Sequence, residues 1–252
     1  MPDVLACIDR SAYSNSVCDH AAWFAGRLGA TIRAIHVNEG QASVAPADGS
    51  PRAEARLQHA LDRLHGEGAL EATAEEARGQ FIDYVSGQAT NLIVMGKRGE
   101  LSHGQRTTLG ASVEKVIRAT ATPVCLTSKI FLPITRALVL LDADMDHRRS
   151  VEFLASHPGL ADLDMDLVVV QGPDQDASEK LSWARASLLS KEAEAFVLEA
   201  TDLDDATARY IERAAVDLVI VSRAVLLSDV QTQLQRIEAR GVWGIRTPVL
   251  VC

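Results

Sequence analysis

The chain has 252 residues, of which 47% are hydrophobic, 23% charged and 4% aromatic, and its formal net charge is -9. This composition is typical of a folded α/β protein and excludes a disordered chain, and no apolar run reaches the roughly 18 residues that a membrane span needs. The acidic charge disfavours a nucleic-acid surface, which is normally basic. The start of the chain lacks the basic, apolar pattern of a secretory leader, so we expect a cytoplasmic protein that acts away from membranes and nucleic acid.

In the first half, short apolar runs rich in β-branched residues alternate with stretches of helical periodicity. The predicted strands are Val4 to Ile8, Thr31 to Val37, Leu70 to Thr73, Asn91 to Met95 and Pro123 to Thr127. The predicted helices are Ser14 to Leu28, which Gly29 should close as a C-cap, Ala53 to Leu64, a short helix over Phe81 to Val85, and one that begins near Ala111. A long loop is expected from Asn38 to Arg52 because this segment is rich in Gly, Ala, Ser and Pro.

The second half repeats this order. Its predicted strands are Ala137 to Leu141, Leu167 to Val170, Ala195 to Leu198, Leu218 to Val221 and Pro248 to Val251. Its predicted helices are Ser150 to Ala155, Ser182 to Glu194 and a segment around Ala208 to Ile211. The best-matched pieces are "NLIVMG" with "DLVIVS" and "TPVCLT" with "TPVLVC". We therefore expect two copies of one unit, in domains 1–130 and 136–252, joined by a linker around Pro133.

The strands are apolar along nearly their whole length, which indicates a parallel sheet covered on both faces by helices. The predicted fold class is thus α/β, with two repeated open parallel-sheet domains. The four cysteines, Cys7, Cys18, Cys125 and Cys252, lack metal-ligand spacing and are expected to be small core residues.

Glycines interrupt the chain between a predicted strand and a predicted helix, at Gly96, Gly99, Gly104 and Gly110. In open parallel sheets, ligands bind beyond the carboxyl ends of the strands, and free amide groups at a helix start favour an anion there. Positive charge and hydroxyl groups for a phosphate are available nearby, from Lys97, Arg98, Arg106, Thr107, Thr108 and Ser112, and His103 lies in the same loop. The alternative is that the glycines only allow a surface loop to turn.

Asp9 follows the first predicted strand and therefore lies at the same sheet edge as Gly96, with Ser11 just beyond it. A carboxylate there could accept a hydrogen bond from an exocyclic amine or a ribose hydroxyl. Asp9 could instead cap the helix that starts near Ser14. Together with the glycine loop, the first role is favoured.

The segment "GKRGELSHGQRTTLGAS" resembles the motif of universal stress proteins, Gly-x-x-Gly followed at a distance by Gly-Ser or Gly-Thr. Gly96, Gly99 and Gly110 supply the glycines, while Ala111 stands where the family has a hydroxyl residue. The chain as a whole is similar to the tandem type of this family, with two domains in one polypeptide. In the second half, Ser222 and Val225 replace the first two glycines, although Asp142 still follows its first strand.

This resemblance implies Rossmann-like domains of the adenine nucleotide alpha hydrolase-like type, packed as a pseudo-dimer in which the last strands of the two halves pair. It implies one competent site in the first half that binds ATP, or ADP or AMP, with or without Mg²⁺. Asp9 would lie near the adenine, Val37 would frame the base, and the phosphates would contact the segments before and after the loop. The implied nucleotide-binding residues are Asp9, Val37, Met95, Gly96, Arg98, Gly99, Gly110, Ala111, Ser112 and Val113.

The expected function is that of an adenine-nucleotide-binding stress or regulatory protein whose occupancy changes its protein partners. Two alternatives stay open, a weak ATPase and a ligand-free interaction scaffold, and a further homodimer is compatible with each. No catalytic residue is predicted, because the seven histidines are scattered without the spacing of a triad or a metal site.

Overall fold

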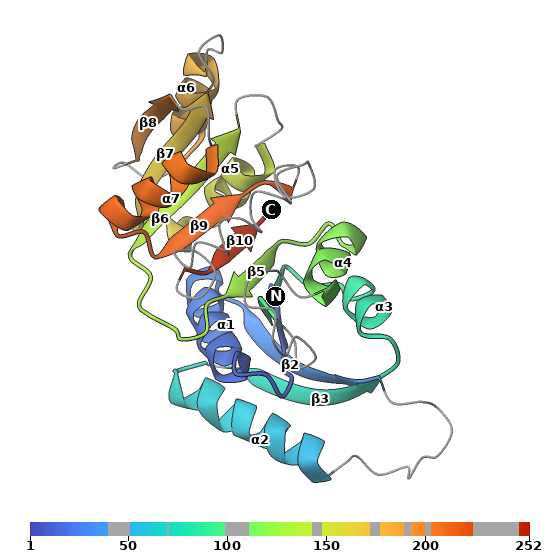
Figure 1. Ribbon diagram of the computed structural model, residues 1–252. Helices are drawn as coiled ribbons and strands as arrows, with labels where there is room; N and C mark the ends of the chain where they lie inside the picture. Colours follow the sequence, from blue (N-terminus) through green and yellow to red (C-terminus); the bar gives the residue numbers. More distant parts are fainter. Residues whose placement is uncertain are drawn as a thin grey trace. The chain divides into compact units, whose positions relative to one another are not determined.

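The computed structural model of the chain describes residues 1–39, 51–69, 71–98, 111–142, 148–171, 177–188, 193–199, 203–223 and 247–252. These residues divide into two compact units, unit 1 up to Phe131 and unit 2 from Leu132 onward. The two units are described separately below, and Figure 1 labels their elements.

Unit 1 contains a parallel sheet with the strand order β3-β2-β1-β4-β5. α1 and α2 pack beside each other on one face of this sheet, and α3 and α4 lie beside each other on the opposite face (Figure 1). Its elements are β1 (Asp3–Cys7), α1 (Ser14–Leu28), β2 (Thr31–Asn38), α2 (Pro51–Gly66), β3 (Ala72–Arg78), α3 (Phe81–Ser86), β4 (Leu92–Gly96), α4 (Ala111–Ala119) and β5 (Val124–Thr127).

Unit 2 has the corresponding order, β10-β9-β6-β7-β8, and its strands are also parallel. The first strand of each unit is thus central, flanked by the second and the fourth. The prediction of two repeated α/β units with open parallel sheets is confirmed. The elements of unit 2 are β6 (Arg136–Asp142), α5 (Arg148–Ala155), the 3-10 turn η1 (Pro158–Leu160), β7 (Asp164–Gln171), α6 (Ser178–Ser187), β8 (Glu194–Glu199), α7 (Leu203–Ala214), β9 (Leu218–Val221) and β10 (Val249–Val251).

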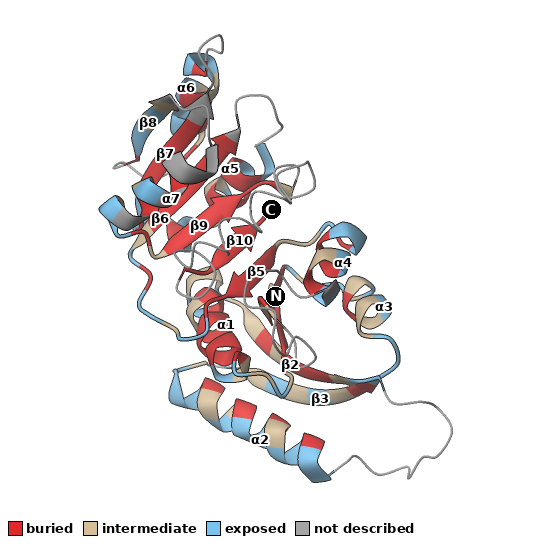
Figure 2. Cartoon of the chain, in the orientation of Figure 1, coloured by how far each residue is buried: buried red, intermediate tan, exposed pale blue. Residues whose placement is uncertain are grey.

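The central strands form the core of each unit, as Figure 2 shows by their buried colour. Val4, Leu5 and Ala6 of β1 have no exposed surface, and the same holds for Leu138 and Val139 of β6. Strands that are apolar on both sides need helices on both faces of the sheet, since each face would otherwise contact water. The near-continuous apolar runs of the sequence therefore specify the doubly covered parallel sheet.

Helix α1 has the bounds that its sequence predicts. Val17, Ala21 and Phe24 recur at helical spacing and are buried against the sheet. Full burial of a side chain such as Phe24 contributes about 1.5–3 kcal/mol relative to its exposure. The helix ends at Gly29, which adopts a left-handed conformation with a φ of 59° and donates its N–H to the Ala25 carbonyl. The predicted glycine C-cap is confirmed.

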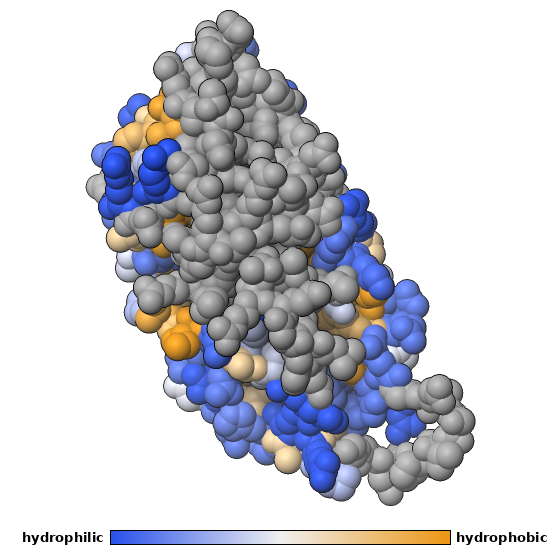
Figure 3. Space-filling model, in the orientation of Figure 1, coloured by the Kyte–Doolittle hydropathy of each residue, from blue (hydrophilic) through white to orange (hydrophobic). Residues whose placement is uncertain are grey.

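Helix α2 is amphipathic, with Ala53, Leu57, Ala60 and Leu64 buried at spacings of three and four residues. Its remaining surface is largely charged, and the described surface at the lower end of the view in Figure 3 is mostly hydrophilic. The helix begins at Pro51 and β2 ends at Asn38, so the predicted loop is wrong in including Asn38, Pro51 and Arg52. Residues 40–50 of that loop lie outside the described residues.

Two other predicted boundaries are wrong. The third strand occupies Ala72–Arg78 rather than Leu70 to Thr73, and the helix predicted over Ser182 to Glu194 is instead α6, Ser178–Ser187. Glu194 begins strand β8. The first error concerns an edge strand, whose charged residues give it the appearance of helix or loop in the sequence. The strand predicted over Ala195 to Leu198 is confirmed as β8.

Candidate functional site

The carboxyl edge of the unit 1 sheet brings together several of the predicted site residues. β2, β1 and β4 are parallel neighbours, so their carboxyl ends lie at one edge. Asp9 follows β1, Val37 is the penultimate residue of β2, and Met95 and Gly96 end β4. This edge is the place where open parallel sheets bind ligands.

The Asp9 carboxylate is fixed by a turn between β1 and α1. Its Oδ1 accepts the Ser11 N–H at 2.9 Å and the Ser14 hydroxyl at 3.2 Å. The Ser14 Oγ also lies 2.5 Å from the Asp9 carbonyl oxygen, to which it can donate, and accepts the Asp9 N–H at 3.2 Å. The N-cap of α1 is Tyr13, so the carboxylate orders the turn and does not cap the helix. Within the described part of the chain, Oδ2 has no hydrogen-bond partner.

Gly96 is required by a close contact with an aromatic residue. A Cβ atom at Gly96 would lie 2.7 Å from the Cβ atom of Tyr13, a distance that real side chains do not adopt. Tyr13 is buried where it covers the end of β4. The sequence motif indicated a phosphate as the reason for this glycine and gave no sign of Tyr13 beyond an aromatic residue just before α1.

Lys97, which the sequence analysis named as positive charge for a phosphate, lies in the interior. Its side chain is only 2% exposed. Lys97 lies near His20, a fully buried residue on α1. Burial is the main cause that lowers the pKa of His20 to about 4, and the positive charge of Lys97 lowers this pKa further. His20 Nδ1 donates to the Ser16 carbonyl at 2.7 Å, whereas its buried Nε2 has no hydrogen-bond partner in the described ranges of the chain. Lys97 therefore belongs to the interior beneath the edge.

The helix expected to aim its amide groups at the ligand is present as α4, beginning at Ala111. Ser112 is exposed, and Arg98 is half-buried just after β4. Val113 is 1% exposed, so its side chain packs in the core and only its backbone could contact a ligand. Several residues of the predicted loop lie outside the described residues, namely Gly99, His103, Gly104, Arg106, Thr107, Thr108 and Gly110.

A histidine and an arginine that the sequence argument did not connect support the same edge. His36 is buried, and its Nδ1 donates to the Ile8 carbonyl at 2.9 Å. That bond leaves a lone pair on Nε2, which accepts from Arg56 Nη2 on α2 at 3.0 Å. The chain of contacts ties α2 and β2 to the residue just before Asp9.

The corresponding edge of unit 2 is built differently. Ser222 stands at the end of β9 where unit 1 has Gly96, and its side chain is 2% exposed. The next residue, Arg223, donates its N–H to the Cys252 carbonyl. Burial lowers the pKa of the Arg223 guanidinium, and the nearby Arg149 lowers it further. Residues 224–246 lie outside the described residues.

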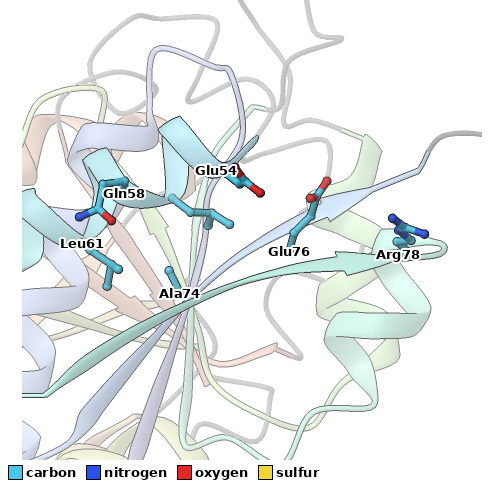
Figure 4. A pocket seen from close by; sticks show the side chains of 7 residues that line it. Glu54, Gln58, Leu61, Ala74, Glu76 and Arg78 are labelled. Atoms are coloured by element: carbon cyan, nitrogen blue, oxygen red, sulfur yellow. The ribbon is translucent and has the colours of Figure 1, made fainter. Parts of the chain in front are cut away.

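A groove of about 480 Å³ lies between α2 and β3 (Figure 4). None of the predicted site residues is among the residues that line it. Glu54 and Glu76 contribute carboxylates and Arg78 a single guanidinium, so this groove does not suit a phosphate. Its lining is Glu54, Leu57, Gln58, Leu61, Ala74, Glu76 and Arg78.

Among the described residues, no group of three or more His, Cys, Asp or Glu side chains is placed to hold a metal ion. The four cysteines are buried and unbridged, and burial raises the pKa of each thiol, as expected of core residues. No helix in the described ranges has the length and apolar character to cross a bilayer.

Comparison with known proteins agrees with this architecture. A model of the universal stress protein family matches residues 1–128, slightly more than half of the chain. The chain belongs to the universal stress protein family. A universal stress protein from Synechocystis is 27% identical over 256 residues, which cover 88% of this chain and 89% of the relative.

Solved universal stress proteins match the chain in two ways. A structure from Archaeoglobus fulgidus covers 99% of this chain and 97% of its own, with 17% identity and a TM-score of 0.73. A second universal stress protein from Archaeoglobus fulgidus, solved in complex with dAMP, covers 49% of this chain and 94% of its own, with 23% identity and a TM-score of 0.40. The full-length match shows that the chain has the fold of a tandem, two-domain universal stress protein.

Proposed function

We propose that unit 1 binds an adenine nucleotide, with ATP as the first candidate, at the carboxyl edge of its sheet. The observation that carries this proposal is the Asp9 carboxylate, whose Oδ1 is held by Ser11 and Ser14 while Oδ2 accepts no hydrogen bond from the described residues. Asp9 follows β1, whose neighbours in the sheet are β2 and β4, so this residue lies between the ends of those two strands. A prepositioned acceptor at this place suits the amine of adenine or a ribose hydroxyl.

The choice of an adenine nucleotide also rests on the family to which the chain belongs and on its glycine motif. In the proposed complex, the backbone around Val37 frames the base, and Met95 and Gly96 lead the chain toward the phosphates. Backbone N–H groups of Ala111, Ser112 and Val113 at the start of α4 face the phosphates, because the first N–H groups of a helix have no partner within it. Arg98 adds positive charge, and Gly99 and Gly110 complete the loop.

The proposed role is regulatory: nucleotide occupancy at this edge changes the surface that protein partners contact, as part of a stress response. Unit 2 lacks the glycines and has the buried Ser222 at the corresponding strand end. We infer that it supports the fold and binds no nucleotide.

Asp9→Asn is the sharpest test, because asparagine keeps an Oδ1 acceptor for Ser11 and Ser14 but replaces the free oxygen by an amino group. Loss of one ligand hydrogen bond to a charged acceptor corresponds to about 1.5–3 kcal/mol, or roughly a ten- to hundredfold weaker Kd. Titration calorimetry with ATP, ADP and AMP, with and without Mg²⁺, would measure it. Asp142→Asn, the matched change at the end of β6, should leave the Kd unchanged.

Mass spectrometry of small molecules released on denaturation would show whether the purified protein carries a nucleotide. Absence of both a released nucleotide and measurable binding would contradict the proposal and favour a scaffold. Equal losses from Asp9→Asn and Asp142→Asn would contradict the assignment of the site to unit 1.

A further inference from the structure

The amino-terminal edges of the two sheets carry matching ion pairs. In unit 1, Arg33 on β2 donates from Nε and Nη2 to Oδ2 of Asp3 on β1, both at 2.9 Å. In unit 2, Arg136 on β6 donates from Nε and Nη2 to the two carboxylate oxygens of Asp166 on β7, also at 2.9 Å. Each pair thus joins the first strand of its unit to the second.

The four residues occupy equivalent places in the two units. Asp3 lies opposite Thr31 in the strand register and bonds the residue two further along β2. Arg136 lies opposite Asp164 and likewise bonds the residue two further along β7. Asp3 therefore corresponds to Arg136.

The backbone around the first strands confirms this correspondence. Asp3 N–H donates to the Asn91 side chain at 3.0 Å, and Asn91 N–H donates to the Asp3 carbonyl at 2.9 Å. Arg136 exchanges the same two hydrogen bonds with Asp217, at 3.0 and 2.9 Å. The polarity of the ion pair is nevertheless reversed: the acid is on the first strand in unit 1 and on the second strand in unit 2.

The apolar residues of these strands give little reason for one pairing over another. Val4, Leu5 and Ala6 of β1 correspond to Ala137, Leu138 and Val139 of β6, and all six are fully buried apolar residues. A β1 segment could therefore satisfy its backbone and bury apolar side chains beside β7 as well as beside β2. In a chain with two similar units, such exchange would produce mixed sheets within one molecule or between two copies.

We propose that the reversed polarity of the two ion pairs prevents the first two strands of one unit from pairing with those of the other. If β1 paired with β7 in the native register, Asp3 would face Asp166, and if β6 paired with β2, Arg136 would face Arg33. Like charges on adjacent strands are destabilising. Asp166 is 2% exposed in its own unit, so a second carboxylate beside it would meet little screening by water.

Neighbouring groups reinforce each native pair. Glu75 on β3 lies 3.8 Å from Arg33, and Gln88 accepts from the same guanidinium at 3.0 Å. In unit 2, Tyr210 on α7 lies close enough to Asp166 for the carboxylate to raise the pKa of the tyrosine, although burial is the larger cause. Each arginine is thus placed among acceptors of its own unit.

The test reverses one pair at a time. The double variant Asp3→Arg/Arg33→Asp keeps an ion pair in unit 1 but makes every cross-pairing attractive, and Arg136→Asp/Asp166→Arg does the same from the other side. The quadruple variant reverses both pairs and restores the repulsion. Each full-length protein would be unfolded in urea and refolded by dilution at several concentrations, and light scattering after size exclusion would measure assemblies larger than those of the starting protein.

We expect each double variant to form such assemblies severalfold more than the wild type, increasingly with concentration, and the quadruple variant to return to the wild-type level. Wild-type behaviour of both double variants would overturn the proposal. So would a quadruple variant that misassembles more than the doubles, since that would trace the effect to damaged local geometry.

Discussion

Unit 1 and unit 2 resemble each other closely at the amino-terminal edges of their sheets and differ at the carboxyl edges. At the amino-terminal edges, Asp3 and Arg136 make the same backbone hydrogen bonds and matching ion pairs. At the carboxyl edges, unit 1 has an ordered carboxylate turn and Gly96 under Tyr13, whereas unit 2 has the buried Ser222. Features common to both units serve the sheet itself, so the edge that differs is where the function of unit 1 is to be sought.

The first way to test this comparison is at the amino-terminal edges, where the ion pairs are equivalent but unequally buried. Arg136→Leu leaves the Asp166 carboxylate, 2% exposed, without its cation, and should lower the free energy of unfolding by about 3 kcal/mol. Arg33→Leu leaves Asp3, 17% exposed, closer to water and should cost about 1 kcal/mol or less. Urea unfolding followed by circular dichroism would measure both.

The double variant Arg136→Leu/Asp166→Asn should recover much of the lost stability, because no unpaired charge then remains buried. If Arg136→Leu and Arg33→Leu lowered the free energy of unfolding equally, the two edges would have the same electrostatic environment. That result would contradict the prediction based on the different burial of Asp166 and Asp3.

A smaller effect on the free energy of unfolding is expected from His20 on α1. His20 lies four residues after Ser16, and its counterpart in unit 2 is Leu154, which lies four residues after Ser150 on α5. Burial holds the pKa of His20 at about 4 in the folded state, below the ordinary value of 6.5. The folded state therefore loses stability as the pH falls from 6.5 toward 4, by about 2 kcal/mol between pH 7 and pH 5.

His20→Leu, which places the unit 2 residue in unit 1, should remove that part of the acid sensitivity. Urea unfolding at pH 7 and pH 5 would measure the difference, with His65→Leu on the exposed side of α2 as the control. An unchanged pH dependence in His20→Leu would show that this histidine is already protonated or hydrated in the folded protein.

The last comparison concerns the strand ends. Gly96→Ala introduces the Cβ atom that would lie 2.7 Å from Tyr13, and should cost about 1.5 kcal/mol as the turn shifts. Gly26→Ala in α1 meets nothing within 4 Å and should be neutral or slightly stabilising. A thermal unfolding midpoint for Gly96→Ala equal to that of the wild type would mean that Tyr13 moves away without cost.

Most strands could be predicted from the sequence because they are central. Runs such as that of β4 are apolar along their length, and only a strand buried on both faces explains them at that length. β3 could not be predicted as well, because an edge strand is half exposed and tolerates glutamate, which equally suits a helix. The choice between helix and strand in such a segment depends on pairing with a neighbouring strand, and the local sequence carries no information on that pairing.

The candidate site shows a similar division. Asp9 and Gly96 could be predicted to share an edge, since that follows from strand order alone. The contact of Gly96 with Tyr13, the burial of Lys97 and the link from Arg56 through His36 to Ile8 could not, because each depends on how a helix is rotated against the sheet. Periodicity identifies the buried side of a helix but not the individual atoms that meet there.

The acidic residues of β3 have a consequence for the behaviour of concentrated solutions. β3 is the outermost strand of the unit 1 sheet, and Glu75 and Glu76 give it negative charge on both of its faces. A strand from a neighbouring molecule that docked along this open border in the same orientation would bring its own glutamates alongside. Fibril growth by this route is thereby opposed, so unit 1 should stay dispersed at concentrations where a neutral border would seed aggregates.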